Sequence, residues 1–95
     1  MKEAAFVVCN PGHVAIALAY RPPEIAVPQV LVRAIDEAAL EVKRRCRTLE
    51  IPIVEEIALA RSLLATAEAG KAIPVPLYAA VAAVVAALMR SGSLR

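Results

Sequence analysis

Asn10, Pro11, Gly12 and His13 are four consecutive residues whose types and order permit chemistry on the chain itself. An asparagine usually decays when the next residue's amide nitrogen attacks its side chain, but Pro11 has no N–H and closes that route. The side-chain nitrogen of Asn10 can still attack its own backbone carbonyl, close a succinimide ring and expel the nitrogen of Pro11. Such a unimolecular step needs a turn that holds the two reacting atoms close together. The order of residues therefore permits self-cleavage between Asn10 and Pro11.

The same four residues also read as an ordinary hairpin turn. Proline at the second position and glycine at the third are typical of a type II turn, and such turns are common in proteins without any reactivity. His13 is close enough in sequence to carry a proton to or from the reacting groups. It is equally well explained as a neutral residue at the start of a strand. Composition alone leaves both interpretations open.

The cysteines and the single histidine set limits on other chemistry. Cys9 and Cys46 with His13 cannot supply the four ligands of a structural zinc site, so we expect no metal and no cofactor. Cys9 has no activating partner other than His13, and a small buried strand residue is the favoured interpretation. Two lone thiols fit a reducing cytosol but do not exclude other compartments.

Length and charge restrict the fold and the partners. The chain has 95 residues, enough for one core, so we expect a single domain over residues 1–95. The net charge is +2 with 60% hydrophobic residues, which argues against a nucleic-acid partner because such domains carry a clustered basic face. The longest uncharged run, residues 73–89, is shorter than the ~20 residues of a membrane-spanning helix. Its start also contains two prolines.

Periodicity predicts a small α/β domain. Residues 13–20 alternate, with Val14, Ile16 and Leu18 on one face and alanines on the other, as in a strand covered on both sides. Apolar residues from 29 to 50 recur at helical spacing and predict a long amphipathic helix. The expected elements are strands at 4–9, 13–20, 51–54 and 72–73 and helices at 29–50, 57–69 and 76–91. They predict a mixed four-stranded sheet with helices packed around it.

Two stretches outside the turn suggest contacts with partners. The last predicted helix has no polar stripe before Arg90, so in so small a domain we expect one side of it to form an exposed docking surface. Lys43, Arg44, Arg45 and Arg47 form a basic cluster late in the long helix. A solvated face is the favoured interpretation of this cluster, and contact with acidic lipid or a partner is the alternative.

The stretch FVVCNPGHVAIALAY, residues 6–20, resembles the signature of the FlhB/SctU family of flagellar and injectisome export switches. The hallmark of that family is Asn-Pro-Thr-His between two strands. The resemblance continues through AVPQV at 26–30, IPIVEE at 51–56, LARSLL at 59–64 and IPVPLYAAVA at 73–82. It covers nearly the whole chain in order.

This resemblance implies roles for particular residues. Asn10 would be the self-cleaving residue, Pro11 the leaving group and His13 the supporting residue, and the two pieces would stay together in one sheet. Gly12 stands where the family has threonine. Because glycine adopts positive φ without cost, less strain would drive the reaction here, and cleavage would be slower or absent. A groove formed by Val27, Pro28, Ala82 and Val85 would bind export substrates, unless the last helix buries these residues completely.

The resemblance also implies a cellular setting. Cleavage would switch an export apparatus from early to late substrates in concert with a secreted ruler protein and other export-gate components. Full-length members carry a membrane domain before this one, so we expect an excised fragment located at the cytoplasmic face of the bacterial inner membrane. The main alternative is a non-cleaving, stand-alone adaptor that starts at its own Met1 and docks export components. A module that binds the membrane surface through the basic cluster is the third.

Overall fold

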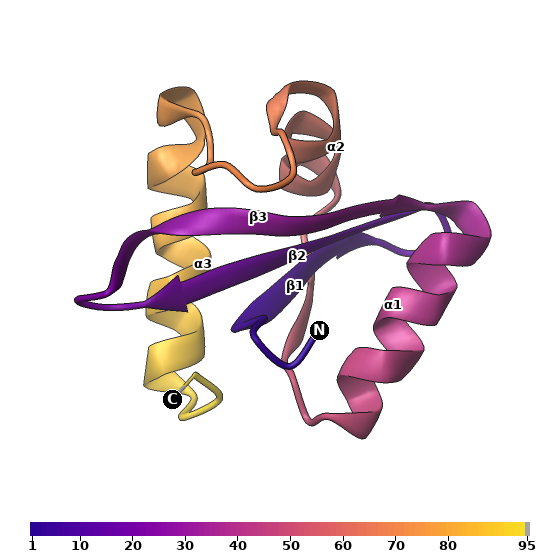
Figure 1. Ribbon diagram of the computed structural model, residues 1–95, viewed down its shortest axis with the longest axis horizontal. Helices are drawn as coiled ribbons and strands as arrows, with labels where there is room; N and C mark the ends of the chain where they lie inside the picture. The colour runs from indigo at the N-terminus through magenta and orange to yellow at the C-terminus, as the bar shows by residue number, and fades with distance from the viewer. Residues whose placement is uncertain (95) are drawn as a thin grey trace.

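A computed structural model describes residues 1–94 and contains one four-stranded sheet with the order β3-β2-β1-β4 (Figure 1). β1 and β2 pair antiparallel, as do β2 and β3, whereas β1 and β4 pair parallel. The sheet is therefore mixed and four-stranded, which confirms the predicted fold class. The strands are β1 Phe6–Asn10, β2 Val14–Arg21, β3 Ile25–Ile35 and β4 Ile53–Glu55.

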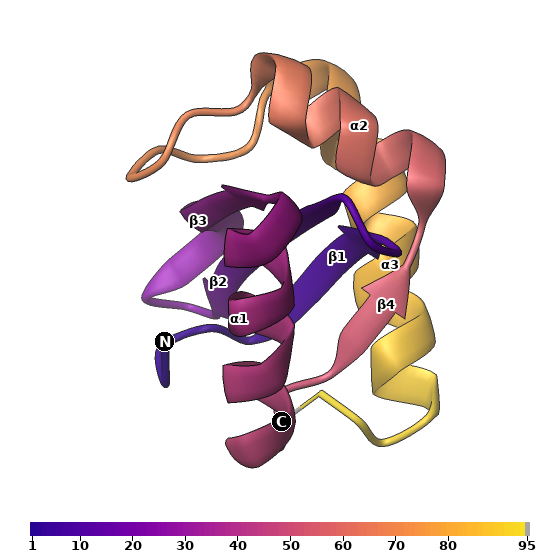
Figure 2. The same cartoon turned by 90° about the vertical axis from the view of Figure 1, so that its right-hand side faces the viewer.

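Three helices cover the two faces of the sheet. α1 (Asp36–Thr48) lies on one face, and α2 (Ile57–Thr66) and α3 (Tyr78–Arg90) lie on the other (Figure 2). A 3-10 turn, η1 (Val75–Leu77), leads into α3. Within residues 1–94, none of the helices combines the length and the apolar character required to cross a membrane.

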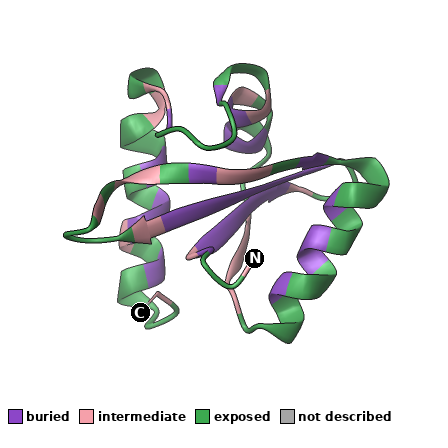
Figure 3. Cartoon of the chain, in the orientation of Figure 1, coloured by how far each residue is buried: buried purple, intermediate pink, exposed green. Residues whose placement is uncertain are grey.

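The alternation of β2 divides the core in two, as its sequence predicts. Val14, Ile16 and Leu18 join the larger cluster beneath α2 and α3. Ala15 and Ala17 join the smaller cluster beneath α1, where Val7, Ala39 and Cys46 also lie. The central strands β1 and β2 are almost entirely buried, and the outward faces of the helices are exposed (Figure 3). Alanine on one face of β2 leaves room for α1 to approach the sheet closely.

The prediction of one helix from residue 29 to residue 50 is wrong in its first part. Residues up to Ile35 belong to β3, and α1 begins only at Asp36. A β-bulge explains the error: Val30 pairs with Leu18 and Val32 with Ala17, so Leu31 is the extra residue. The bulge puts Leu31 and Val32 on the same side of the sheet. This interruption of the two-residue alternation imitates helical spacing.

The outer edge of β3 is partly covered by the chain segment after α2. Val30 N–H donates to the carbonyl of Lys71 at 2.8 Å, and Ile73 N–H donates to the carbonyl of Pro28 at 3.0 Å. The short strand expected at residues 72–73 is only a single bridge between Gln29 and Ala72. This segment covers part of an edge strand that would otherwise be open to pairing with another chain. Pro28 is tolerated in β3 because β3 is an edge strand.

Two of the remaining helix boundaries differ from expectation. α2 ends at Thr66, three residues before the predicted end at residue 69. Gly70, which has φ +85° and follows the predicted helix directly, is a turn residue beyond α2 and not a helix cap. α3 starts two residues later than predicted because η1 precedes it. Its inner face, with Val81, Val84 and Leu88, is buried, while most of its alanines are exposed. The expected exposed apolar side of this helix is thus confirmed.

Candidate functional site

The loop that joins β1 to β2 is a tight turn with the Asn-Pro-Gly-His motif at its tip. The N–H of His13 donates to the carbonyl of Asn10 at 3.0 Å, and Gly12 at the third position has φ +83°. Both features define a type II turn and confirm the predicted turn type. Pro11, Gly12 and His13 are exposed, and Asn10 is half-buried at the end of β1.

The N–H of His13 is hydrogen-bonded to the Asn10 carbonyl oxygen, the atom on which charge would develop in the cleavage reaction. If the Asn10 side chain attacked its own carbonyl carbon, the carbonyl oxygen would become negative in the tetrahedral intermediate. The His13 N–H already lies 3.0 Å from that oxygen. A fixed backbone donor at this position stabilises an oxyanion without reorganisation. The turn therefore holds a backbone donor at the place where such an oxyanion would form.

Two further backbone hydrogen bonds hold the loop in place. Asp36 N–H, where β3 meets α1, donates to the carbonyl of His13 at 2.8 Å. Glu56 N–H, between β4 and α2, donates to the carbonyl of Cys9 at 3.1 Å. The turn is thus held from both sides by segments distant in sequence. Its geometry depends on the whole sheet.

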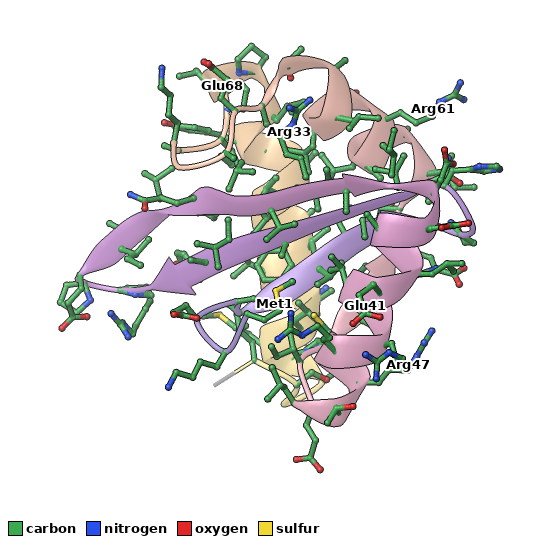
Figure 4. The ribbon with its side chains drawn as sticks, turned by 45° about the vertical axis from the view of Figure 1, so that its right-hand side comes forward. Met1, Arg33, Glu41, Arg47, Arg61 and Glu68 are labelled. Carbon is green, nitrogen blue, oxygen red and sulfur yellow. The ribbon has the colours of Figure 1, made fainter. Side chains whose placement is uncertain are left out.

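Charged side chains surround the loop. The Nδ1 atom of His13 lies 3.8 Å from Oδ1 of Asp36, and both side chains are 72% exposed. Asn10, His13 and Arg61 line one shallow recess under α2. Arg33 donates from Nη2 to the carbonyl of Leu64 and ties the end of α2 to β3. Figure 4 shows Arg33 beneath that end of α2 and Arg61 farther along the same helix.

Neither cysteine has the character of a nucleophile. Cys9 and Cys46 are free and buried in the cluster beneath α1. Burial raises the pKa of the Cys9 thiol and of the Cys46 thiol. A raised pKa keeps the sulfur protonated at neutral pH and unreactive. The geometry therefore favours the structural interpretation of Cys9.

The second candidate site is an apolar groove between α3 and the sheet. Its volume is about 370 Å³, and Val27, Pro28, Ala82 and Val85 all line it. The structure thus brings together the four residues that the sequence grouped. The groove also includes residues that sequence reasoning did not single out, namely Tyr20, Ala26, Ile73, Tyr78, Val81, Ala86 and Met89.

The basic cluster on α1 is mostly a solvated surface. Arg44 pairs with Glu41 at 2.6 Å on the exposed side of the helix. Arg45 and Arg47 are exposed in the last turn, where they complement the helix dipole. Lys43 differs from its neighbours because it is only 8% exposed. These positions agree with the favoured interpretation of the cluster.

Comparison with known proteins assigns this arrangement to a family. The model of the FlhB HrpN YscU SpaS family matches residues 1–88, which is nearly the whole chain and includes the turn and every groove residue except Met89. The chain belongs to this family. The resemblance found in the sequence is thereby confirmed.

Relatives in the family are much longer than this chain. It is 37% identical over 90 residues to the secretion system apparatus protein SsaU of Salmonella typhimurium, a match covering 95% of this chain and 26% of SsaU. It is 39% identical over 84 residues to the flagellar biosynthetic protein FlhB of Yersinia enterocolitica, covering 88% of this chain and 22% of FlhB. The chain therefore spans about a quarter of these relatives.

Solved structures from the family have the same fold. The cytoplasmic domain of FlhB from Shewanella putrefaciens superposes with a TM-score of 0.86 at 32% identity, covering 93% of this chain and 72% of that one. The PscU C-terminal domain superposes with a TM-score of 0.79 at 38% identity, covering 82% and 99%. In both comparisons the sequence identity is above 30%.

Sequence reasoning missed two charged residues beside the family's signature turn. Arg61 falls within the LARSLL stretch that carries part of the resemblance, so that stretch was a signal for its importance. Asp36 had no such signal, because the sequence placed it in the middle of a helix. Only the end of β3 at Ile35 brings Asp36 next to His13.

Proposed function

We propose that this chain is the cytoplasmic domain of a type III secretion or flagellar export protein that controls substrate-specificity switching. We further propose that it cuts itself between Asn10 and Pro11. The observation that carries the cleavage proposal is the type II turn, in which the His13 N–H is hydrogen-bonded to the Asn10 carbonyl. Family membership supports the export role.

The proposed reaction needs only groups of the chain. Nδ2 of Asn10 forms a bond to the Asn10 carbonyl carbon and loses a proton. The bond from that carbon to the Pro11 nitrogen breaks, and the nitrogen keeps the electron pair and takes up a proton. His13 relays the proton between the two nitrogens. The products are a succinimide at the end of residues 1–10 and a new amino terminus at Pro11, and water later opens the ring.

The two pieces are expected to remain together after the cut. β1 lies between β2 and β4, and its side chains Phe6, Val7 and Val8 are fully buried. Each such side chain contributes about 1.5–3 kcal/mol of burial. Native mass spectrometry should therefore give one complex of residues 1–10 with 11–95, and denaturing mass spectrometry should give two fragments. Separation of the pieces on a native sizing column would contradict this expectation.

The export role implies partners and a location. The chain would work with other export-gate components, with export substrates and with a secreted ruler protein. The membrane domain of its own full-length chain would hold it at the cytoplasmic face of the bacterial inner membrane. The size of the relatives supports this, since they are about four times longer than the matched region.

The apolar groove is the proposed docking place for export substrates. Ala82 is exposed on α3 and lines the groove beside Val27 and Pro28. Ala82→Asp should weaken binding of peptides from early export substrates about fivefold, because an apolar peptide would desolvate the new charge. Fluorescence anisotropy with labelled peptides measures the effect.

Ala79→Asp is the matched control for this variant. Ala79 is exposed on the same helix and is not among the residues that line the groove. The Ala79→Asp variant should leave peptide affinity unchanged. Equal losses in Ala82→Asp and Ala79→Asp would point to a general charge effect and against the groove.

A non-cleaving adaptor that docks export components through α3 is the second candidate function. Gly12 favours it, because a glycine at φ +83° is unstrained and stores no energy in the turn. The two candidates share the groove and differ in the chemistry of the loop. A single uncut mass after long incubation of the purified chain at neutral pH would decide for the adaptor.

A further inference from the structure

We propose that Asp36 is a positioning residue for self-cleavage, which orients His13 and stabilises the positive charge that His13 acquires while it carries the proton. This inference rests on the proposed cleavage function. Its geometric basis is the 3.8 Å approach between Nδ1 of His13 and Oδ1 of Asp36. The Asp36 N–H also donates to the His13 carbonyl at 2.8 Å, so both backbones are fixed relative to each other.

The backbone of Asp36 is strained, which sets it apart from ordinary helix residues. Its φ is +49° at the first position of α1. Among residues 1–94 only one other non-glycine residue, Glu50, has positive φ, and it follows the end of α1, where this conformation is common. Strain that persists without such an explanation often marks a functional position. The strained residue here is the one beside His13.

The contact leaves the second imidazole nitrogen free for the reaction. With Nδ1 turned toward Asp36, Nε2 of His13 is the nitrogen that can accept the proton from Asn10 and return it to Pro11. During this transfer the ring is an imidazolium, and the Asp36 carboxylate opposes its charge. An exposed pair at this distance contributes a modest stabilisation. Asp36 therefore changes the rate of cleavage and not its outcome.

Charged residues near the loop come from α1, from α2 and from the junction between β4 and α2. Asp36 at the start of α1 contacts His13, and Arg61 of α2 lines the recess with Asn10 and His13. Glu56, whose N–H donates to Cys9, lies on the other side of β1. Of these, Asp36 is the carboxylate for which the structure gives a contact with the imidazole. A carboxylate is the group required to stabilise an imidazolium.

Three substitutions at one position separate charge from backbone strain. Asp36→Asn removes the charge but tolerates positive φ, and Asp36→Gly removes both charge and strain. Asp36→Glu keeps the charge.

Freshly refolded chains are followed by intact mass at neutral pH and low salt. We expect the Asn and Gly variants to cleave about threefold more slowly and the Glu variant to retain most of the rate. Glu37→Gln, which removes the neighbouring exposed carboxylate, should cleave like the unchanged chain.

Salt and a second substitution test whether the effect passes through His13. At 1 M NaCl the unchanged chain should slow to the rate of Asp36→Asn, because exposed charges are screened. Adding Asp36→Asn to a His13→Ala chain should change nothing further. A further loss in that background, or a Gly variant as fast as the unchanged chain, would overturn the role of Asp36.

The outcomes also distinguish the role of Asp36 from the proposed self-cleavage on which it rests. An unchanged chain that stays uncut overturns both the proposed cleavage and the role of Asp36. An unchanged chain that cleaves at the same rate as Asp36→Asn overturns the role of Asp36 alone and leaves the cleavage proposal standing.

Discussion

Replacing Asn10 with alanine is expected to abolish the fragment that begins at Pro11. The substitution removes the attacking nitrogen. Among the neighbours of Asn10, Pro11 and Gly12 have no nucleophilic side chain, and Cys9 is buried. Loss of the nucleophile should slow cleavage on the order of a thousandfold or more. Intact mass under denaturing conditions, followed over days at neutral pH, measures the effect.

The mass of the short fragment also identifies the mechanism. Cyclisation gives residues 1–10 one water lighter than hydrolysis does, because the succinimide forms before water is added. A contaminating protease would give only the hydrated fragment. Appearance of the lighter form, followed by its conversion to the heavier one, is therefore expected in the unchanged chain.

Gln29→Ala serves as the control for Asn10→Ala. Gln29 carries the same amide group on the exposed surface of β3. This variant should cleave normally. The Asn10→Ala chain should keep its circular dichroism spectrum and its peptide binding, since Asn10 is only half-buried at the end of β1. Normal cleavage in Asn10→Ala would contradict the proposed chemistry.

Replacing Gly12 with threonine is expected to accelerate cleavage about tenfold. Gly12 has φ +83°, and a Cβ atom added there would meet nothing within 4 Å. The substitution therefore adds backbone strain of about 1–2 kcal/mol without a steric clash. Strain in the uncut turn is released when the chain breaks, so the barrier falls, and about 1.4 kcal/mol corresponds to tenfold in rate. A time course of intact mass after refolding measures this.

Gly70→Thr is the matched control for the strain argument. Gly70 has φ +85° and equally open surroundings, but it lies in the segment between α2 and η1. Both variants should lose similar stability in thermal unfolding, and only Gly12→Thr should change the rate of cleavage. A Gly12→Thr chain that cleaves no faster than the unchanged chain would show that ground-state strain does not drive the reaction.

The turn at residues 10–13 and the apolar groove lie at opposite ends of β2. Val14 follows the turn, and Tyr20 lines the groove six residues farther along the strand. At about 3.4 Å per residue Val14 and Tyr20 are roughly 20 Å apart. A cut at Asn10 therefore does not touch the groove directly. Any influence of cleavage on groove binding has to pass through the sheet or through a partner that contacts both ends.

Local chemistry explains which parts of the fold could be predicted from the sequence. The alternation of β2 and the proline and glycine of the turn are signals that lie within a few residues, and the structure agrees with them. β3 was mistaken for the start of a helix because its bulge at Leu31 breaks the alternation. Pairing with β2 decides this segment, and that pairing joins residues distant in the chain.

In the candidate site, too, some features depend on adjacent residues and others depend on tertiary packing. The sequence by itself determined the Asn-Pro-Gly-His motif, the type of turn and the family, because each depends on the order of adjacent residues. Only the tertiary structure decided that Asp36 faces His13, that Arg61 lines the recess of Asn10, and that the groove gathers residues from β2, β3 and α3. The physical reason is that these contacts depend on strand register and helix packing, which are set by burial across the whole sheet and not by neighbouring residues.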